Sequence, residues 1–313
     1  MVSELVSKGK LKVAGIFRML VKIGLIPFSA FVKIFDCQVQ SCLLYGAELW
    51  GLNRVESVEK VHTSAVKRYL SVSSHTPNTM IYAETGRYPL FINSAMKCIK
   101  YWLRLVSMSN NRYTCKAYKM LRCMDENGKH CWVSVVKKFL IENGFGIVWL
   151  NQGVGNAGVF LKQLKEKLVY TYSLSWHETV LSSDRFHVYR SFKDTIMIET
   201  YIKSVDQRYL RDTYCRFRLG VSDILCHKNR YNGKDNTCPL CKIGPENERH
   251  FVMECTAYND LRVRLIPSDV FDRGFNCMMS SQENDIIYAM CKFLHSAFRH
   301  RSLVLQPPSE ADS

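Results

Sequence analysis

The sequence CPLCKIGPENERHFVMEC, residues 238–255, sets three cysteines and one histidine at the spacing C-x2-C-x8-H-x4-C. Two cysteines that are separated by two residues can face the same side of one tight turn, and Gly244 and Pro245 favour a further turn in the loop. Three thiolates and one imidazole are a usual ligand set of a structural zinc site, which leaves no coordination position open for a substrate. The sequence therefore predicts one structural Zn²⁺ ion, bound by Cys238, Cys241, His250 and Cys255.

The alternative interpretation of this stretch is that its cysteines are ordinary buried thiols. The chain contains 13 cysteines, so one C-x-x-C pair alone is a weak signal, but a histidine and a third cysteine at finger-like distances make it specific. Soft thiolate ligands with an imidazole favour zinc over magnesium or calcium. The nearby Cys226 and His227 are a less favoured, substitute pair of ligands.

Composition restricts the partners and the compartment. The chain has 313 residues, 47% of them hydrophobic, as expected of a packed globular protein. Its 43 Lys and Arg exceed its 28 Asp and Glu, and the formal net charge of +15 favours a polyanionic partner, with RNA or DNA first. Scattered cysteines, odd in number and without a secretory pattern, predict an intracellular protein, nuclear or cytoplasmic and not secreted.

The apolar stretch 13–35 is the one segment that could suggest a membrane. Arg18, Lys22 and Lys33 interrupt it and Pro27 breaks it, so we expect neither a signal peptide nor a membrane span. We find no phosphate-binding loop and no nucleophile elbow, and we therefore expect no small-molecule substrate.

Apolar residues recur every three or four positions over most of the chain, which predicts a mainly α fold. The clearest helices are expected at 54–72, 93–107 and 284–301, whereas 267–282 is expected to be a loop. In the helix at 93–107, Ala95, Cys98, Trp102 and Leu105 should face the core.

Two groups of basic residues are candidates for contact with nucleic acid. Lys97, Lys100 and Arg104 share one helix face beside Tyr101, and the open alternative for this group is that its charges serve solubility alone. The second group lies within 184–237, where Arg208, Arg211, Arg216, Arg218, Lys228 and Arg230 alternate with seven aromatic residues, Tyr189, Phe192, Tyr201, Tyr209, Tyr214, Phe217 and Tyr231. Guanidinium groups can bind phosphates and aromatic rings can stack on bases. The alternative is that the rings form a core and the arginines pair with local acids; we favour nucleic-acid contact.

Five segments follow one another in an order that is specific as a set, although no single segment is decisive. They are Tyr45–Gly51 with the helix at 54–72, Tyr82–Pro89, the pair Tyr189–Lys193 and Arg216–Val221, the finger Cys238–Tyr258 with Arg262, and Tyr288–Arg301. Together they resemble the C-terminal part of reverse transcriptases of non-LTR (LINE-type) retrotransposons, over roughly residues 1–301.

The resemblance implies a helical thumb-like bundle, a helical connector, and a small zinc-bound CCHC domain with a closing C-terminal helix. In the family, the thumb grips template and primer, and the C-terminal region is thought to bind element RNA or target DNA. The corresponding limits are 1–112 for the thumb-like region, 113–183 for the connector, 184–270 for the basic segment with the finger, 271–305 for the linker and last helix, and 306–313 for a disordered tail.

The chain lacks the family's catalytic signatures. Polymerisation needs paired carboxylates on magnesium, and no two aspartates are adjacent in this sequence. The nuclease of some relatives needs an acid two residues before a lysine; the only lysine after Cys255 is Lys292, and residue 290 is Met. We therefore expect a non-enzymatic, nucleic-acid-binding remnant of such a protein. The alternatives are a zinc-stabilised module that binds a protein partner and, less favoured, a subunit that needs a polymerase palm in trans.

Overall fold

The structure is a computed structural model that describes residues 1–24 and 26–306. These residues form α-helices joined by loops and short 3₁₀ and π-helical turns, and they contain no β-strand. Two isolated β-bridges, Thr85 with Ile198 and Thr237 with Pro245, are the extended pairings found among them. The prediction of a mainly α protein is thus confirmed. The predicted tail, 306–313, lies outside the described residues except for Gln306.

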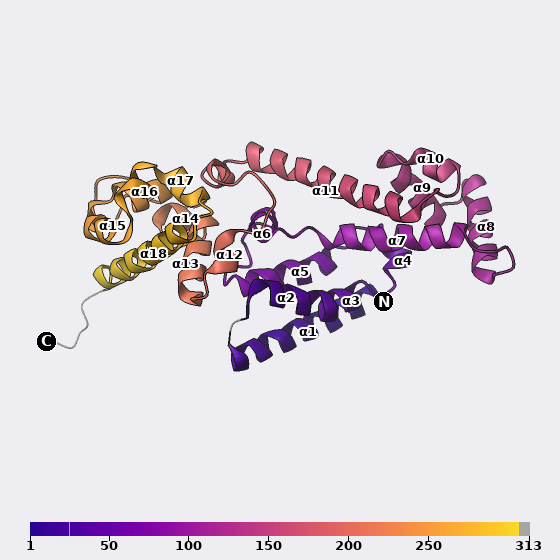
Figure 1. Cartoon of the computed structure of the whole chain (residues 1–313), viewed down its shortest axis with the longest axis horizontal. Helices are drawn as coiled ribbons and strands as arrows, with labels where there is room; N and C mark the ends of the chain where they lie inside the picture. Colours follow the sequence, from indigo (N-terminus) through magenta and orange to yellow (C-terminus); the bar gives the residue numbers. More distant parts are fainter. Residues whose placement is uncertain (25, 307–313) are drawn as a thin grey trace. The chain divides into compact units, whose positions relative to one another are not determined.

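The described chain forms two compact units, each built from separate segments (Figure 1). The first unit comprises residues 1–23, 32–63 and 88–176, and the second comprises the described residues of 24–31, 64–87 and the chain from 177 onward. Residues 64–87, predicted within the region 1–112, therefore group with the C-terminal part of the chain.

The first unit contains the long N-terminal helix and the helices of the predicted connector. They are α1 (Val2–Ile23), α3 (Ser41–Leu43), α4 (Ala47–Trp50), α7 (Leu90–Val106), α8 (Tyr113–Glu126), α9 (Trp132–Glu142) and α10 (Gly146–Leu150). Parts of α2 (Phe28–Ile34) and α5 (Glu56–Tyr69), a π-helical turn at Phe35–Gln40 and most of α11 (Ala157–Ser182) complete it. Gly46, at φ +66°, separates α3 from α4.

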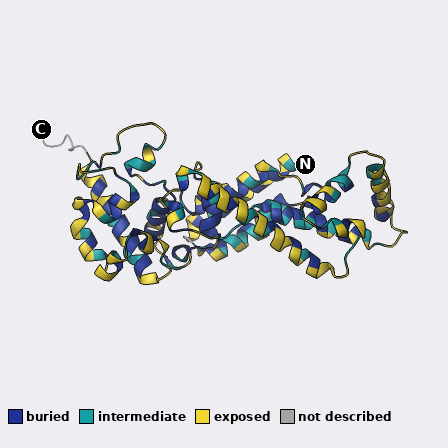
Figure 2. Ribbon diagram, turned by 90° about the horizontal axis from the view of Figure 1, so that it is seen from above, coloured by how far each residue is buried: buried dark blue, intermediate teal, exposed yellow. Residues whose placement is uncertain are grey.

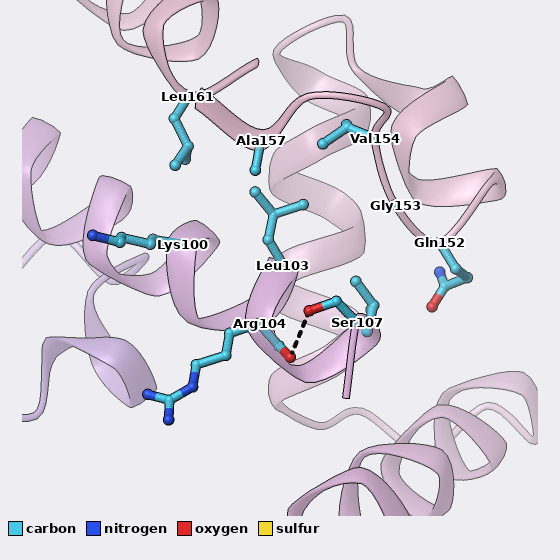
Figure 3. Close-up of a pocket in the computed structure, with 10 residues that line it drawn as sticks. Lys100, Leu103, Arg104, Ser107, Gln152, Gly153, Val154, Ala157 and Leu161 are labelled. Carbon is cyan, nitrogen blue, oxygen red and sulfur yellow. Dashed lines mark hydrogen bonds between the residues drawn. The ribbon is translucent and has the colours of Figure 1, made fainter. Parts of the chain in front are cut away.

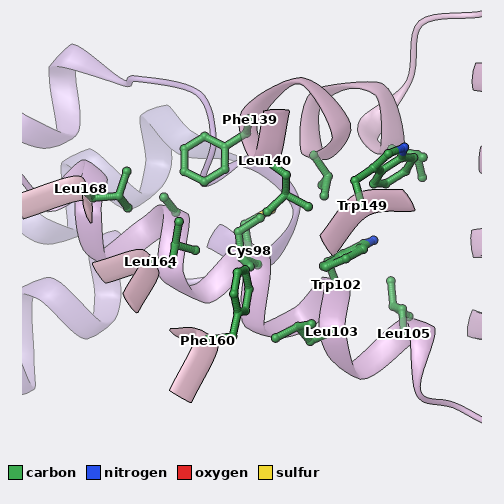
Figure 4. Close-up of a cluster of buried hydrophobic side chains, with 14 of the residues drawn as sticks. Cys98, Trp102, Leu103, Leu105, Phe139, Leu140, Trp149, Phe160, Leu164 and Leu168 are labelled. Atoms are coloured by element: carbon green, nitrogen blue, oxygen red, sulfur yellow. The ribbon is translucent and has the colours of Figure 1, made fainter. Parts of the chain in front are cut away.

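The core of the first unit forms around α7 (Figure 4). Ala95, Cys98, Trp102 and Leu105 are all buried, as the helical spacing predicted. The Trp102 ring stacks on that of Trp149 with 6.0 Å between the ring centroids, and its indole N–H donates to Tyr118 Oη at 3.1 Å. One helix face therefore organises a core to which α8, α9, α10 and α11 contribute.

The second unit contains α6 (Asn78–Thr85), α12 (Thr200–Ser204), α13 (Arg208–Arg218), α14 (Leu225–Lys228), α15 (Asn259–Leu265), α16 (Ser268–Asp272), α17 (Phe275–Ser280) and α18 (Asn284–Val304). The last helix confirms the prediction at 284–301, and α12, α13 and α15 contact it. The prediction of a loop over 267–282 is wrong, because α16 and α17 lie there and bury Val270, Phe275 and Met279. Figure 2 shows buried and exposed residues on opposite faces of the long helices.

A buried ion network connects distant segments of the second unit. The Glu84 carboxylate, which is fully buried, accepts two hydrogen bonds of 3.1 Å from the Arg218 guanidinium. It also accepts hydrogen bonds from the hydroxyls of Tyr189, at 3.0 Å, and Tyr201, at 2.7 Å. Arg218 additionally contacts Glu199 at 3.2 Å, and Glu199 pairs with Lys193. The stretches Tyr82–Pro89, Tyr189–Lys193 and Arg216–Val221 thus meet in one structural cluster.

Gly86 permits the chain at residues 84–86 to approach the chain at residues 198–199 closely. It has φ +63°, and a Cβ atom there would lie 2.7 Å from the backbone nitrogen of Ile198. The adjacent backbone bond, from Glu199 N–H to the Glu84 carbonyl at 2.9 Å, requires this approach. A side chain at residue 86 would therefore strain the backbone and separate the segments.

None of the helices within residues 1–24 and 26–306 combines the length and the apolar character needed to cross a bilayer.

Candidate metal centre

The four predicted zinc ligands lie together in the second unit. One ligand atom from each of Cys238, Cys241, His250 and Cys255 falls within 4.8 Å of all the others. The Sγ atoms of Cys238 and Cys255 are 3.8 Å apart, and Cys241 Sγ lies 3.3 Å from His250 Nε2. A tetrahedron with metal–sulfur bonds of about 2.3 Å has edges of about 3.8 Å, so these separations suit one shared ion.

A tight turn presents the first two ligands. The backbone N–H of Cys238 donates to the Gly244 carbonyl at 2.7 Å, and that of Lys242 donates to the Cys238 carbonyl at 3.1 Å. Lys242 adopts φ +61°, which reverses the chain directly after Cys241. The turn chemistry expected from the sequence is therefore present, and both thiols face the same side.

A short π-helical turn, His250–Glu254, presents the other two ligands. The Asn247 side-chain oxygen accepts from the backbone N–H of His250 at 2.8 Å and begins this turn. The backbone N–H of Cys255 then bonds the His250 carbonyl at 2.8 Å, and this bond directs the third thiol back toward the histidine. Arg262 completes the turn by donating from Nε to the Val252 carbonyl at 2.8 Å.

The protonation preferences of the ligands differ with their surroundings. Burial raises the pKa of the Cys255 thiol to about 12. Burial also opposes ionisation of Cys241, but hydrogen bonds from the backbone N–H groups of Ile243 and Gly244, together with the neighbouring thiols, outweigh it and lower its pKa. Nδ1 of His250 lies 3.7 Å from a Glu254 carboxylate oxygen, on the side of the ring away from Cys241. That carboxylate favours the tautomer that leaves Nε2 free to bind a metal.

A second, carboxylate-centred contact holds the finger against the last helix, and we did not predict it from the sequence. The fully buried Glu246 accepts from Arg301 of α18 at 2.6 and 2.9 Å and from the backbone N–H of Leu225 at 2.8 Å. Next to the ligands, the Phe251 ring stacks on Phe298 of α18 with 4.7 Å between the centroids. These contacts anchor the closing helix beside the ligand cluster.

The substitute ligand pair is engaged elsewhere. His227 Nε2 lies 2.8 Å from a Glu248 carboxylate oxygen, and Nδ1 lies 2.8 Å from the Ser222 hydroxyl. Cys226 likewise lies outside the group of ligand atoms that could share one ion. The ranking of Cys238, Cys241, His250 and Cys255 above this pair is therefore supported.

The nine basic residues predicted to contact nucleic acid differ in exposure. Lys100, Arg104, Arg208, Arg216 and Lys228 are exposed, Lys97 and Arg230 are half-buried, and Arg211 and Arg218 are buried. The prediction for the last two must be corrected, because their side chains are only 3% and 1% exposed. Arg218 is neutralised by Glu84, and Arg211 lies over the Tyr69 ring, 4.9 Å from its centroid. Neither guanidinium reaches the surface in this fold.

Most of the aromatic residues in this segment are also internal. Five of the seven rings are buried, namely Tyr189, Phe192, Tyr201, Tyr214 and Phe217. For these five, the alternative interpretation as core residues holds. Tyr209 and Tyr231, which are 56% and 78% exposed, remain available for stacking.

Two of the four remaining candidate cations in the second unit are neutralised by acids, and two form no ion pair within the described chain. Lys228 pairs with Asp223 at 3.1 Å, and Arg208 pairs with Asp212 at 3.3 Å. Arg216 donates from Nε to the Ser71 carbonyl at 2.8 Å, which leaves its charge unopposed. Across residues 1–24 and 26–306, no carboxylate forms an ion pair with Arg216 or Arg230.

The candidate cations of the first unit lie on α7. Lys97 donates to the Leu44 carbonyl at 3.1 Å. Lys100 and Arg104 border a cavity between α7 and the segment before α11 (Figure 3).

Comparisons of the chain with protein-family models, with curated proteins and with solved structures found no match. The resemblance to reverse transcriptases of non-LTR retrotransposons therefore stays a prediction from the sequence.

Proposed function

We propose that this protein binds single- or double-stranded nucleic acid without catalysing a reaction, and that a structural zinc ion shapes part of its surface. The observation that carries the proposal is the set of exposed cations that form no ion pair among the described residues, Lys100, Arg104 and Arg216, in a chain of net charge +15. Such cations gain free energy by releasing the counterions condensed on a polyphosphate. The ordered resemblance to non-LTR reverse transcriptases supports the same binding function, and the lack of adjacent aspartates supports the non-catalytic part of the proposal.

Zinc suits the donor set in this proposal. Cys238, Cys241, His250 and Cys255 would hold it, and the ion would fix the turns that carry them. With four protein ligands the metal has no open position, so its contribution is structural. Metal analysis of the purified protein should find one zinc ion per chain. The same analysis of a Cys238→Ser variant should find that the zinc is lost.

The salt dependence of binding tests the nucleic-acid proposal. If about five phosphates are contacted, the logarithm of the affinity for RNA or DNA should fall with the logarithm of salt concentration with a slope of about −3 to −5. Binding that does not depend on salt, or no binding at low salt to either single-stranded RNA or duplex DNA, would contradict the proposal.

A pair of variants with the same charge change gives a matched control. Arg104→Gln removes an exposed cation that forms no ion pair among the described residues and should make the salt slope shallower by about one. Arg273→Gln removes a cation that already pairs with Asp269, at 3.1 Å, and should change the slope little. Equal effects of the two substitutions would show that overall charge, and not this surface, governs binding.

The alternative, a zinc-stabilised module for a protein partner, is favoured by one observation. Beside the ligand cluster, Val263 is 87% exposed and lies on a groove with Ile266 and Phe271. Val263→Asp should abolish partner binding under this alternative and leave nucleic-acid affinity almost unchanged under the main proposal.

A further inference from the structure

A cavity of about 590 Å³ lies in the first unit, between α7 and the segment that leads into α11. Figure 3 shows the side chains of Leu103, Val154, Ala157 and Leu161 converging on it. None of the described residues that line it is acidic. Its volume falls within the range of sites that enclose small organic groups. The cavity can therefore cover a flat group that has apolar faces.

Two cations stand beside this apolar lining. Lys100 and Arg104 are one helical turn apart on α7, which corresponds to about 6 Å along the helix axis. Figure 3 shows their charged ends extending away from the converging apolar side chains. Neither charged group takes part in an ion pair among the described residues. Cations in this position suit phosphates that stay in solvent while an attached apolar group enters the cavity.

Polar groups border the same cavity. The Ser107 hydroxyl donates to the Arg104 carbonyl at 3.1 Å, so its oxygen can still accept a hydrogen bond. The Gln152 amide nitrogen donates to the Trp149 carbonyl at 2.6 Å, and its oxygen accepts from the Tyr118 hydroxyl. Each Gln152 atom keeps one further hydrogen-bonding site. These two hydrogen bonds fix the Gln152 amide at the border of the cavity.

We propose that this cavity takes the base of one unstacked nucleotide from a single-stranded nucleic acid, while Lys100 and Arg104 contact the phosphates on either side. The aliphatic side chains would cover the faces of the base, and Ser107 and Gln152 would meet its polar edge. A base within a duplex cannot enter without unpairing, so the site selects single strands. The inference rests on the nucleic-acid binding proposed above and adds the form of the ligand.

The test compares two probes on the full chain: an oligothymidylate and an oligomer of the same length whose sugar–phosphate backbone carries no bases. The oligothymidylate should bind about tenfold more tightly, a difference of about 1.4 kcal/mol. Ala157→Leu fills the cavity from an exposed position and should abolish this preference without changing affinity for the abasic oligomer. Gln163→Leu, an exposed residue of α11 outside the lining, makes a similar apolar addition and should keep the preference.

The possible results separate this inference from the function on which it rests. Equal binding of the two oligomers by the unmodified chain overturns the base site and leaves nucleic-acid binding intact, whether or not Ala157→Leu folds. Failure of both oligomers to bind at low salt overturns the base site, and it overturns the proposed function as well if single-stranded RNA and duplex DNA also fail to bind. A third result is that decanoate raises the Tm of the unmodified chain but not that of Ala157→Leu, while thymidine monophosphate raises neither. This result overturns the base site and assigns the cavity to aliphatic anions.

Discussion

Replacing Glu84 by alanine should destabilise the second unit strongly. The substitution leaves Arg218, whose side chain is 1% exposed, with only Glu199 as an acidic partner, and Glu199 is already shared with Lys193. Removing one member of a buried ion pair costs about 3–5 kcal/mol, and the hydroxyls of Tyr189 and Tyr201 also lose their acceptor. We expect a loss of about 4 kcal/mol, which for a unit of this size lowers Tm by about 10 °C.

Thermal unfolding followed by circular dichroism measures this loss. Asp269→Ala is a suitable control, because it breaks an exposed pair with Arg273 and should lower Tm by less than about 2 °C. The double variant Glu84→Leu/Arg218→Met removes both charges together and should be less destabilised than Glu84→Ala. If Glu84→Ala shifts Tm no more than the control does, the network does not stabilise the fold and our reasoning fails.

The same carboxylate should make stability depend on pH. Burial alone would raise the pKa of Glu84, but the charge and hydrogen bonds of Arg218 outweigh it, and the pKa lies below its ordinary value of 4.5. A lowered pKa means that the stabilisation is complete above about pH 4.5 and is lost as the pH falls through the folded-state pKa. The free energy of unfolding of Glu84→Gln should therefore depend less on pH between pH 5 and pH 3 than that of the unmodified protein. Urea titration at each pH measures this free energy. Identical pH profiles of the two proteins would show that Glu84 does not set the pH dependence.

Three further predictions concern the finger and its surroundings. Cys241→Ser should prevent metal binding and raise the rate of hydrogen exchange near residues 225–260, while the first unit stays helical. The reason is that structural zinc in finger peptides contributes about 10–16 kcal/mol to folding. An unchanged rate of exchange would argue against a structural metal. Arg301→Met should leave the buried Glu246 carboxylate without its cation and lower Tm by several degrees, whereas Arg299→Met, at an exposed residue of α18, should not. Gly86→Ala should destabilise the second unit by more than 1 kcal/mol in chemical denaturation, because φ +63° and the contact with Ile198 both oppose a Cβ atom; a neutral result would contradict the close approach.

The sequence alone was sufficient for features that depend on local spacing. Cys238 and Cys241 are separated by two residues, and the turns of the finger are short, so the ligand cluster could be recognised without tertiary information. The apolar face of α7 was predicted for the same reason, because Ala95, Cys98 and Trp102 recur at the helical period. By contrast, α16 and α17 were missed, because each spans little more than one helical turn and such a segment shows no periodicity.

Only the tertiary structure decided which charged and aromatic residues are available to a partner. Arg216 and Arg218 are neighbours on one helix, yet the first is exposed and the second is buried. Residues two apart point to different sides of a helix, and the partner that neutralises the inward-facing Arg218 is Glu84, which lies 134 residues away along the chain. Charge counted within a short window cannot reveal such a partner, because opposite charges attract according to their distance in space and the fold sets that distance.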